Sequence, residues 1–319
     1  MNKLDPRNIY DDLHQIPELG FEEFKTSAYL ADKLEAMGYK VTRNIGGTGV
    51  IGEIKGSEAG PVMMLRADMD ALPFLIDGEK KNIHACGHDA HSAMLLAAAS
   101  ELVGKVKRGT LRILFQQGEE TLKGALAVID AGVIEDVDIA LGLHIRPVQD
   151  IAYGEMSPAV RHASSTFVNV VINGLSSHGA RPHLGVNAIE AAAVAINAIT
   201  AIKINPIIPW SCKVTGIKGG GVAPNIIPDK VEMIVDARAQ TNEAMTELLE
   251  KLRRAVTNAA AALGATAEVT TPGGVIPAAE YDDELTAEVA ECIVEVVGEE
   301  KLAKELVNPG GEDFHYFVK

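Results

Sequence analysis

The chain has 319 residues, of which 47% are hydrophobic and 23% are charged, so it is long enough for one large domain or two smaller ones with a real core. Its formal net charge is −15, from 29 Lys and Arg against 44 Asp and Glu, and this acidity without a basic patch argues against a nucleic-acid partner. The three cysteines are scattered, the N-terminus is polar, and no apolar run approaches the roughly 18 residues of a membrane span, so we expect a cytoplasmic protein without a membrane segment.

The first half of the chain alternates between helical and strand-like patterns. Residues 8–37 have helical spacing, interrupted near Pro17. The segments that follow are predicted as a strand at 62–65, a helix at 89–103, a strand at 111–115, a helix at 124–131 and a strand at 138–143. Such alternation predicts an α/β domain with a largely parallel sheet flanked by helices, and ligands of such sheets gather at the carboxyl ends of strands.

The pattern changes after Pro158 to the order βαββαβ, which predicts a compact α+β unit with an antiparallel sheet. Its predicted elements are 166–173, 187–202, 211–217, 230–239, 242–263 and 266–271. Because 283–297 again has the pattern of a helix of the first domain, we interpret the unit as an insertion. The predicted domains are therefore 161–274 for the insertion, and 1–160 with 275–319 for the domain that receives it.

The densest group of metal-binding residue types is HACGHDAH at 84–91. Cys86 and His88 flank a glycine just before a predicted helix, whose N-terminus favours the thiolate form of cysteine. Thiolate and imidazole together suit zinc and similar divalent ions. A buried cysteine beside a core histidine is the alternative, but three histidines, a cysteine and an aspartate within eight residues favour a metal site.

Two further groups end predicted strands. Glu119 and Glu120 form an adjacent pair that can divide the two roles that metal-dependent hydrolysis needs: one carboxylate holds the ion and the other takes a proton from water. His144 ends the next strand. Taken singly, the glutamates are typical of a surface and the histidine of a core, but their convergence with Asp68 and Asp70 at one sheet edge favours a site.

The inserted unit carries a third group of candidates. His178 lies in SHGARPH, and Asn225 follows a glycine-rich stretch and offers an amide that could contact a substrate. Arg238 ends a predicted strand and could hold a substrate carboxylate by paired hydrogen bonds, with a surface ion pair as the equal alternative.

Together these motifs resemble the aminoacylase-type metallopeptidase family, in the branch of N-acyl-amino-acid, hippurate and auxin-conjugate amidohydrolases. They occur in the family's order over nearly the whole chain, and HACGHDAH is the most specific of them. The matching stretches are LHQIPELGFEE (13–23), LRADMDALP (65–73), HACGHDAH (84–91), FQQGEE (115–120), GLH (142–144), SSHGARPH (176–183), APNIIPD (223–229) and GGEDF (310–314).

The resemblance implies a zinc-exopeptidase-like catalytic domain with two divalent metal ions, Zn, Mn, Co or Ni, and an inserted lid that forms a homodimer. It implies Glu119 as general base and His178 as a lid histidine that reaches the partner subunit's site and stabilises the oxyanion. It also implies that Asp70 orients a ligand. The implied metal ligands are Cys86, His88, Glu120 and His144.

The implied reaction is hydrolysis of the amide bond of an N-acyl amino acid or dipeptide by metal-activated water. A dipeptidase or carboxypeptidase of the same fold is an alternative, since the motifs do not define the acyl group or the amino acid. The family's last ligand is a histidine well downstream of the GGEDF motif, whereas this sequence stops at Lys319. Two explanations stay open: a C-terminal tail missing from the sequence, or an incomplete second metal site, which would favour a metal-poor, catalytically weak binding protein.

Overall fold

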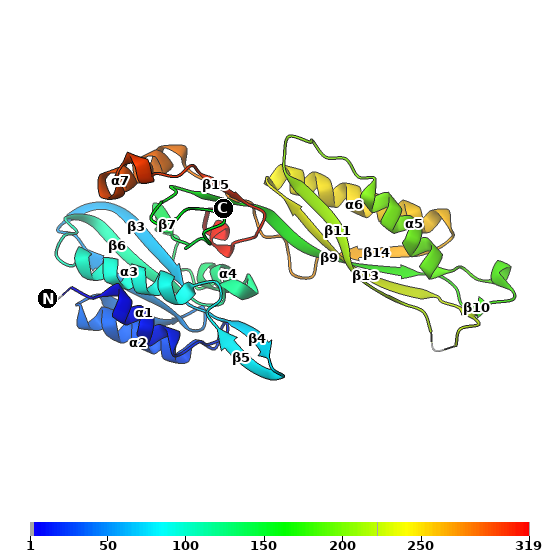
Figure 1. The fold of residues 1–319 in the computed structure, drawn as a ribbon, viewed down its shortest axis with the longest axis horizontal. Coiled ribbons are helices and arrows are strands. Elements are labelled where there is room, and N and C mark those ends of the chain that lie inside the picture. Colours follow the sequence, from blue (N-terminus) through cyan, green and yellow to red (C-terminus); the bar gives the residue numbers. More distant parts are fainter. Residues whose placement is uncertain (1–2, 222, 319) are drawn as a thin grey trace. The chain divides into compact units, whose positions relative to one another are not determined.

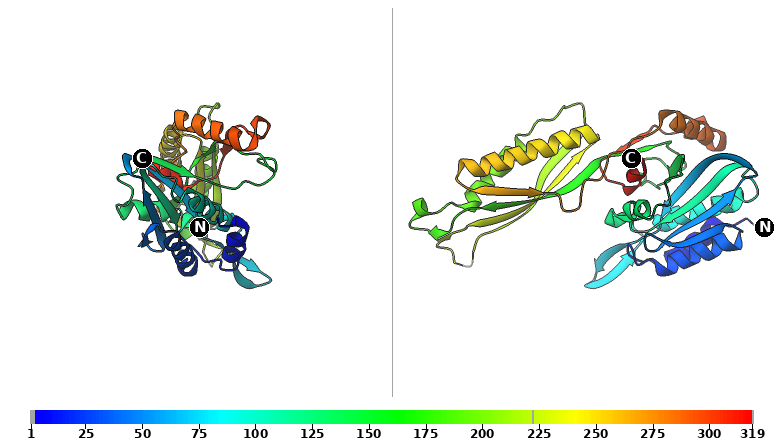
Figure 2. Two further views of the ribbon diagram at one scale, coloured as in Figure 1. Left: turned by 90° about the vertical axis from the view of Figure 1, so that its left-hand side faces the viewer. Right: turned by 180° about the vertical axis from the view of Figure 1, so that it is seen from behind.

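The computed structural model describes residues 3–221 and 223–318, which form two compact units. The first runs to Tyr153 and resumes at Glu312, and the second is Gly154–Gly311 (Figures 1 and 2). Among the described residues, no helix combines the length and the apolar character needed to cross a membrane.

A five-stranded sheet in the order β1-β2-β6-β3-β7 forms the centre of the first unit. Strands β6, β3 and β7 are mutually parallel, whereas β1 and β2 form an antiparallel hairpin that joins β6. The α/β prediction is confirmed, with a mixed sheet in which parallel pairing is confined to the three strands that precede the candidate residues. The strands are β1 (Lys40–Ile45), β2 (Gly49–Lys55), β3 (Glu58–Asp68), β6 (Arg108–Gln116) and β7 (Ile139–Gly142).

Helices pack on both faces of this sheet. On one face, α1 (Pro6–His14), α2 (Phe24–Ala36) and α3 (His88–Leu102) cover alternate residues of β6 that include Ile113 and Phe115. On the other face, α4 (Gly124–Asp130) packs through Val128 against Leu114. Since successive side chains of a strand point to opposite faces, β6 supplies both cores. Shorter elements are the hairpin of β4 (Leu72–Ile76) with β5 (Glu79–Ile83), and the 3-10 turns η1 (Glu119–Thr121) and η4 (Asp313–Val318).

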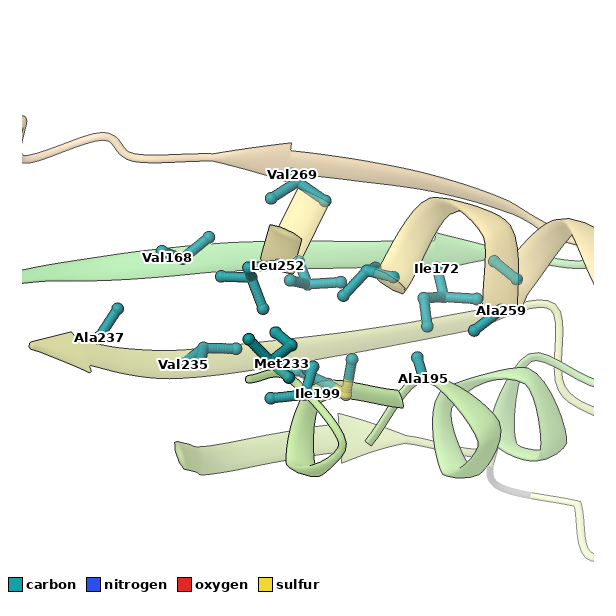
Figure 3. Packing of buried hydrophobic residues seen from close by; sticks show 14 of the residues in the cluster. Val168, Ile172, Ala195, Ile199, Met233, Val235, Ala237, Leu252, Ala259 and Val269 are labelled. Atoms are coloured by element: carbon teal, nitrogen blue, oxygen red, sulfur yellow. The ribbon is translucent and has the colours of Figure 1, made fainter. Parts of the chain in front are cut away.

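The second unit contains the predicted βαββαβ order. Its antiparallel sheet has the order β11-β13-β9-β14, and α5 and α6 cover one face (Figure 1). Figure 3 shows side chains such as Val235 and Leu252 packed between the sheet and the helices. The elements are β9 (Ser164–Asn173), α5 (Ala188–Thr200), β11 (Trp210–Gly219), β13 (Lys230–Ala239), α6 (Asn242–Ala262) and β14 (Thr266–Thr270).

Several small elements complete the second unit. Strand β10 (Ser177–His178) pairs with β12 (Ile226–Ile227), and β8 (Val160–His162) pairs in parallel with β15 (Leu306–Asn308). The remaining ones are η2 (Pro182–Leu184), α7 (Asp283–Val297) and η3 (Glu299–Lys301). Residues 275–311, including α7, thus belong to the same compact unit as 154–274. Their assignment to the domain of residues 1–160 stays a prediction.

Candidate metal centre

The candidate residues of the first unit lie at one edge of its sheet, where the parallel strands β3, β6 and β7 end. The chain leaves β3 at Asp68, leaves β6 toward Glu119 and leaves β7 toward His144. Helix α3 begins at His88, directly after Gly87, which has a left-handed φ of 88°. A Cβ on Gly87 would lie 2.3 Å from Cδ1 of Ile145, and the left-handed φ is strained for other residues, so this position favours glycine.

Two of the overlapping groups of ligand atoms that converge there contain the predicted ligands, and His88 belongs to both. Cys86, His88 and His144 form one group, and His88, Glu119 and Glu120 the other, with all ligand atoms of a group within 4.8 Å of one another. Cys86 Sγ lies 3.6 Å from His144 Nε2, and His88 Nε2 lies 3.8 Å from Glu120 Oε1. Ligand atoms around one zinc ion stand roughly 3–4 Å apart, so these separations fit shared coordination.

Asp70 connects the two groups. Its Oδ1 lies 3.0 Å from Nδ1 of His88, and its Oδ2 accepts a hydrogen bond of 3.0 Å from the backbone N–H of Glu120. The bond to Nδ1 directs Nε2 of His88 toward the cluster. This is the arrangement expected of a carboxylate that orients a metal-binding histidine.

A buried charge network that the sequence analysis did not predict lies behind these groups. Arg66 is 2% exposed and pairs with Asp68 at 2.8 Å, with Glu312 at 3.1 Å and with Asp313 at 2.9 Å. Asp68 in turn lies 2.6 Å from Nδ1 of His91. The motifs RADMD, HACGHDAH and GGEDF are therefore in direct contact. The polar residues of these motifs were the only sign in the sequence from which this network could have been predicted.

The electrostatic surroundings of the cluster shift several protonation equilibria. Burial, followed by repulsion from Glu312 and Asp313, raises the pKa of Glu119 well above its usual value. Burial alone would lower the pKa of His88, but the charges of Asp68 and Asp70 outweigh it and the net shift is upward. A buried carboxylate such as Glu119 is a stronger proton acceptor than an exposed one.

The residues present fit a divalent metal ion. Nε2 of His88 and Oε1 of Glu120 are buried, and neither makes a hydrogen bond within the described residues. A buried polar atom without a partner is costly, and a cation placed between these atoms would satisfy both. The surplus of carboxylates around them also favours a bound positive charge.

The other predicted residues lie in the second unit. His178 is exposed and accepts a hydrogen bond at Nδ1 from the N–H of Ala180, and its strand pairs with the residues that follow Asn225. The N–H of Gly179 donates to the carbonyl of Asn225 at 2.7 Å, so the structure brings these two candidates together. Arg238 donates to Asp236 at 2.9 Å, the ion pair that the sequence analysis gave as its alternative.

Comparison with known proteins identifies the family. Residues 64–319 match the sequence profile of peptidase family M20/M25/M40. The chain belongs to this family. It is therefore a hydrolase, and the predictions of the family, the fold class and an enzyme of this type are confirmed.

Two curated relatives and one solved structure show how much of the chain the similarity covers. Thermostable carboxypeptidase 1 of Saccharolobus solfataricus is 34% identical, over 96% of this chain and 81% of that protein. Hippurate hydrolase of Campylobacter jejuni is 33% identical, over 98% and 84%. The solved structure of the YXEP protein of Bacillus subtilis, described as a dinuclear metal-binding peptidase, superposes with a TM-score of 0.83 at 30% identity, covering 98% of this chain and 84% of that one.

Proposed function

We propose that this member of the family is a metal-dependent amidohydrolase that cleaves the amide bond of N-acyl amino acids or similar small peptide-like substrates. The observation that carries the proposal is the pair of ligand groups that share His88, one of which contains Glu119. The hippurate hydrolase relative supports an N-acyl substrate. The carboxypeptidase relative supports the alternative of a peptidase.

In this proposal Cys86, His88, Glu120 and His144 hold two divalent ions, which are Zn, Mn, Co or Ni. The description of the YXEP structure as dinuclear supports this number of ions. When bound, such ions supply Lewis-acid polarisation of a water molecule and of the scissile carbonyl. Asp70 keeps His88 and the backbone of Glu120 in place for them.

Glu119 acts as general base. Its carboxylate takes a proton from the attacking water and passes it to the nitrogen of the leaving amine. Burial and the neighbouring carboxylates give Glu119 the raised proton affinity that this transfer needs.

The second unit supplies the remaining proposed functions. His178 stabilises the oxyanion in the partner subunit of a homodimer, and Asn225 and Arg238 contact the substrate. His178 is exposed and therefore accessible to a partner, and it lies beside Asn225. We also propose that the enzyme acts in the cytoplasm, which the few scattered cysteines support.

Replacing the proposed base tests the mechanism. In Glu119→Gln, kcat for an N-acyl amino acid should fall about 100- to 10,000-fold, because the amide cannot accept the proton. Elemental analysis after dialysis should give about two ions per chain in both the wild type and the variant. Glu22→Gln, at an exposed glutamate of the same unit, is the matched control and should keep full activity.

Each contrary outcome points to a different error. Unchanged turnover in Glu119→Gln would overturn its assignment as base, whereas loss of an ion from the variant would make Glu119 a ligand. One ion or none in the wild type would contradict the two-metal site. A higher kcat/KM for dipeptides than for N-acyl amino acids would favour the peptidase alternative.

A further inference from the structure

The segment 13–23, with the sequence LHQIPELGFEE, has no part in the function proposed above. It comprises the last two residues of α1 and the connection to α2, and it precedes the residues that match the family profile. In the structure, however, it contacts three residues that are each adjacent in sequence to a candidate residue of the metal centre. Those candidate residues are Asp70, His88 and Glu119.

Two of the contacts are made at the start of α3 and at the residue after Asp70. Nδ1 of His14 lies 2.6 Å from Oδ2 of Asp89, a buried residue in the first turn of α3. The carbonyl of Glu18 accepts a hydrogen bond of 2.8 Å from the N–H of Ala71, and Leu19 forms an isolated parallel bridge with the same residue. The segment thus fixes the start of α3 and the chain that follows β3.

The third contact is made by a buried carboxylate. Glu23 has no exposed surface, and its Oε1 accepts a hydrogen bond of 2.8 Å from the N–H of Gly118, the residue before Glu119. Its Oε2 accepts from the hydroxyl of Thr48, which is itself buried. Hydrogen bonds to a buried carboxylate are among the stronger ones in proteins, so this contact restrains the turn that begins at Gly118.

Close packing reinforces the restraint. Phe21 and Gly118 both adopt left-handed conformations, with φ of 66° and 63°. A Cβ on Gly118 would lie 2.6 Å from Cε2 of Phe21, and one on Gly20 would lie 2.8 Å from Cγ2 of Thr121. The two segments are in close contact at both glycines, so a shift of the turn would also displace the side chain of Phe21.

We propose that Glu23 is a positioning residue for Glu119, and that it acts by fixing the N–H of Gly118. The proposal rests on the assignment of Glu119 as general base. Without the acceptor, the buried N–H of Gly118 loses its partner and the turn reorients to find another. The carboxylates of Glu119 and Glu120 follow the turn, because both belong to η1, which begins directly after Gly118.

Two measurements on substituted proteins test this proposal. Hydrogen exchange of the peptide containing Gly118, followed in metal-free protein, reports on the turn without depending on activity. In Glu23→Ala it should be faster by roughly tenfold or more, since a charge-assisted hydrogen bond is lost. Glu23→Gln can still accept from Gly118 and should restore most of the protection, and Glu22→Ala, at the exposed neighbour, should not change it.

Steady-state kinetics separate positioning from mere stability. In Glu23→Ala, kcat should fall roughly 100-fold with little change in KM, because a small displacement of the base impairs proton transfer more than substrate binding. Glu23→Gln should recover much of kcat. If Glu23→Ala fails to fold, Thr48→Val, which removes the second hydrogen bond, should give a weaker change of the same kind, with Thr48→Ser as its control.

Unchanged exchange at Gly118 in Glu23→Ala would overturn the proposal. Faster exchange with an unchanged kcat would overturn it too, since Glu23 would then stabilise the turn without serving the base. Failure of the proposed function is seen separately: if Glu119→Gln keeps full turnover, Glu119 is not the base, whatever Glu23 does to the turn.

Discussion

His91 is a metal-binding residue type within the cluster, yet its hydrogen bonds leave it no free ring nitrogen for an ion. Its Nδ1 lies 2.6 Å from Asp68, and its Nε2 accepts a hydrogen bond of 2.9 Å from the N–H of Ile145. Both ring nitrogens are therefore engaged, although Asp68, His88 and His91 also form a compact group. We infer that it supports His144 through the adjacent backbone.

Replacing His91 tests this inference. In His91→Ala, the affinity for metal measured by competition with a chelator should fall about 10- to 100-fold, as for other groups that orient ligands. The number of ions bound at saturating metal should stay the same. His183→Ala, at an exposed histidine of the second unit, serves as the control. A lower number of ions at saturation would show instead that His91 is itself a ligand.

The separation of residues along the chain determined how much of the centre could be predicted. Cys86 and His88 lie within one short motif, and Glu119 and Glu120 are adjacent, so residue types and strand ends were sufficient to group them. The pairing of Arg66 with Glu312 and Asp313 joins residues 246 and 247 positions apart. No local pattern encodes such a contact, because it depends on how side chains pack after the sheet has formed.

At the scale of elements, helices and strands with a strong periodic pattern could be predicted from the sequence, whereas a short hairpin could not. The predicted helix 283–297 and the predicted strand 230–239 have the same bounds as α7 and β13. The hairpin of β1 and β2 was missed, although its turn at Gly46 and Gly47 adopts positive φ angles that glycine favours. Its strands have a less regular alternation of polar and apolar residues than β13, and their pairing with β6 depends on tertiary contacts.

The packing of helix α6 against the sheet can be tested by a substitution. Leu252 is fully buried between this helix and the sheet (Figure 3), so Leu252→Ala should lower the free energy of unfolding by about 2–5 kcal/mol. Denaturant unfolding measures this change. Glu250→Ala, at an exposed position of the same helix, should stay within about 0.5 kcal/mol of the wild type. A loss below about 1 kcal/mol in Leu252→Ala would contradict its place in the core.

At the scale of the whole molecule, the two units have separate hydrophobic cores. The core of the second unit includes residues of α5 and α6, whereas that of the first includes residues of α1, α2 and α3. The metal-binding candidates belong to the first unit, and His178, Asn225 and Arg238 belong to the second. The proposed reaction therefore needs residues of both units, although each unit has its own hydrophobic core.

Complementation between two inactive variants tests the proposed division of the site between subunits. Glu119→Gln lacks the base and His178→Ala lacks the oxyanion donor, so each alone should have little activity. If His178 acts on the partner subunit, a mixed dimer contains one site with both residues intact. Random exchange of subunits should then restore about a quarter of the wild-type activity, given a twofold symmetric dimer. If differently tagged subunits exchange and activity does not return, His178 acts within its own chain, and a fully active monomer in solution would reject the dimer itself.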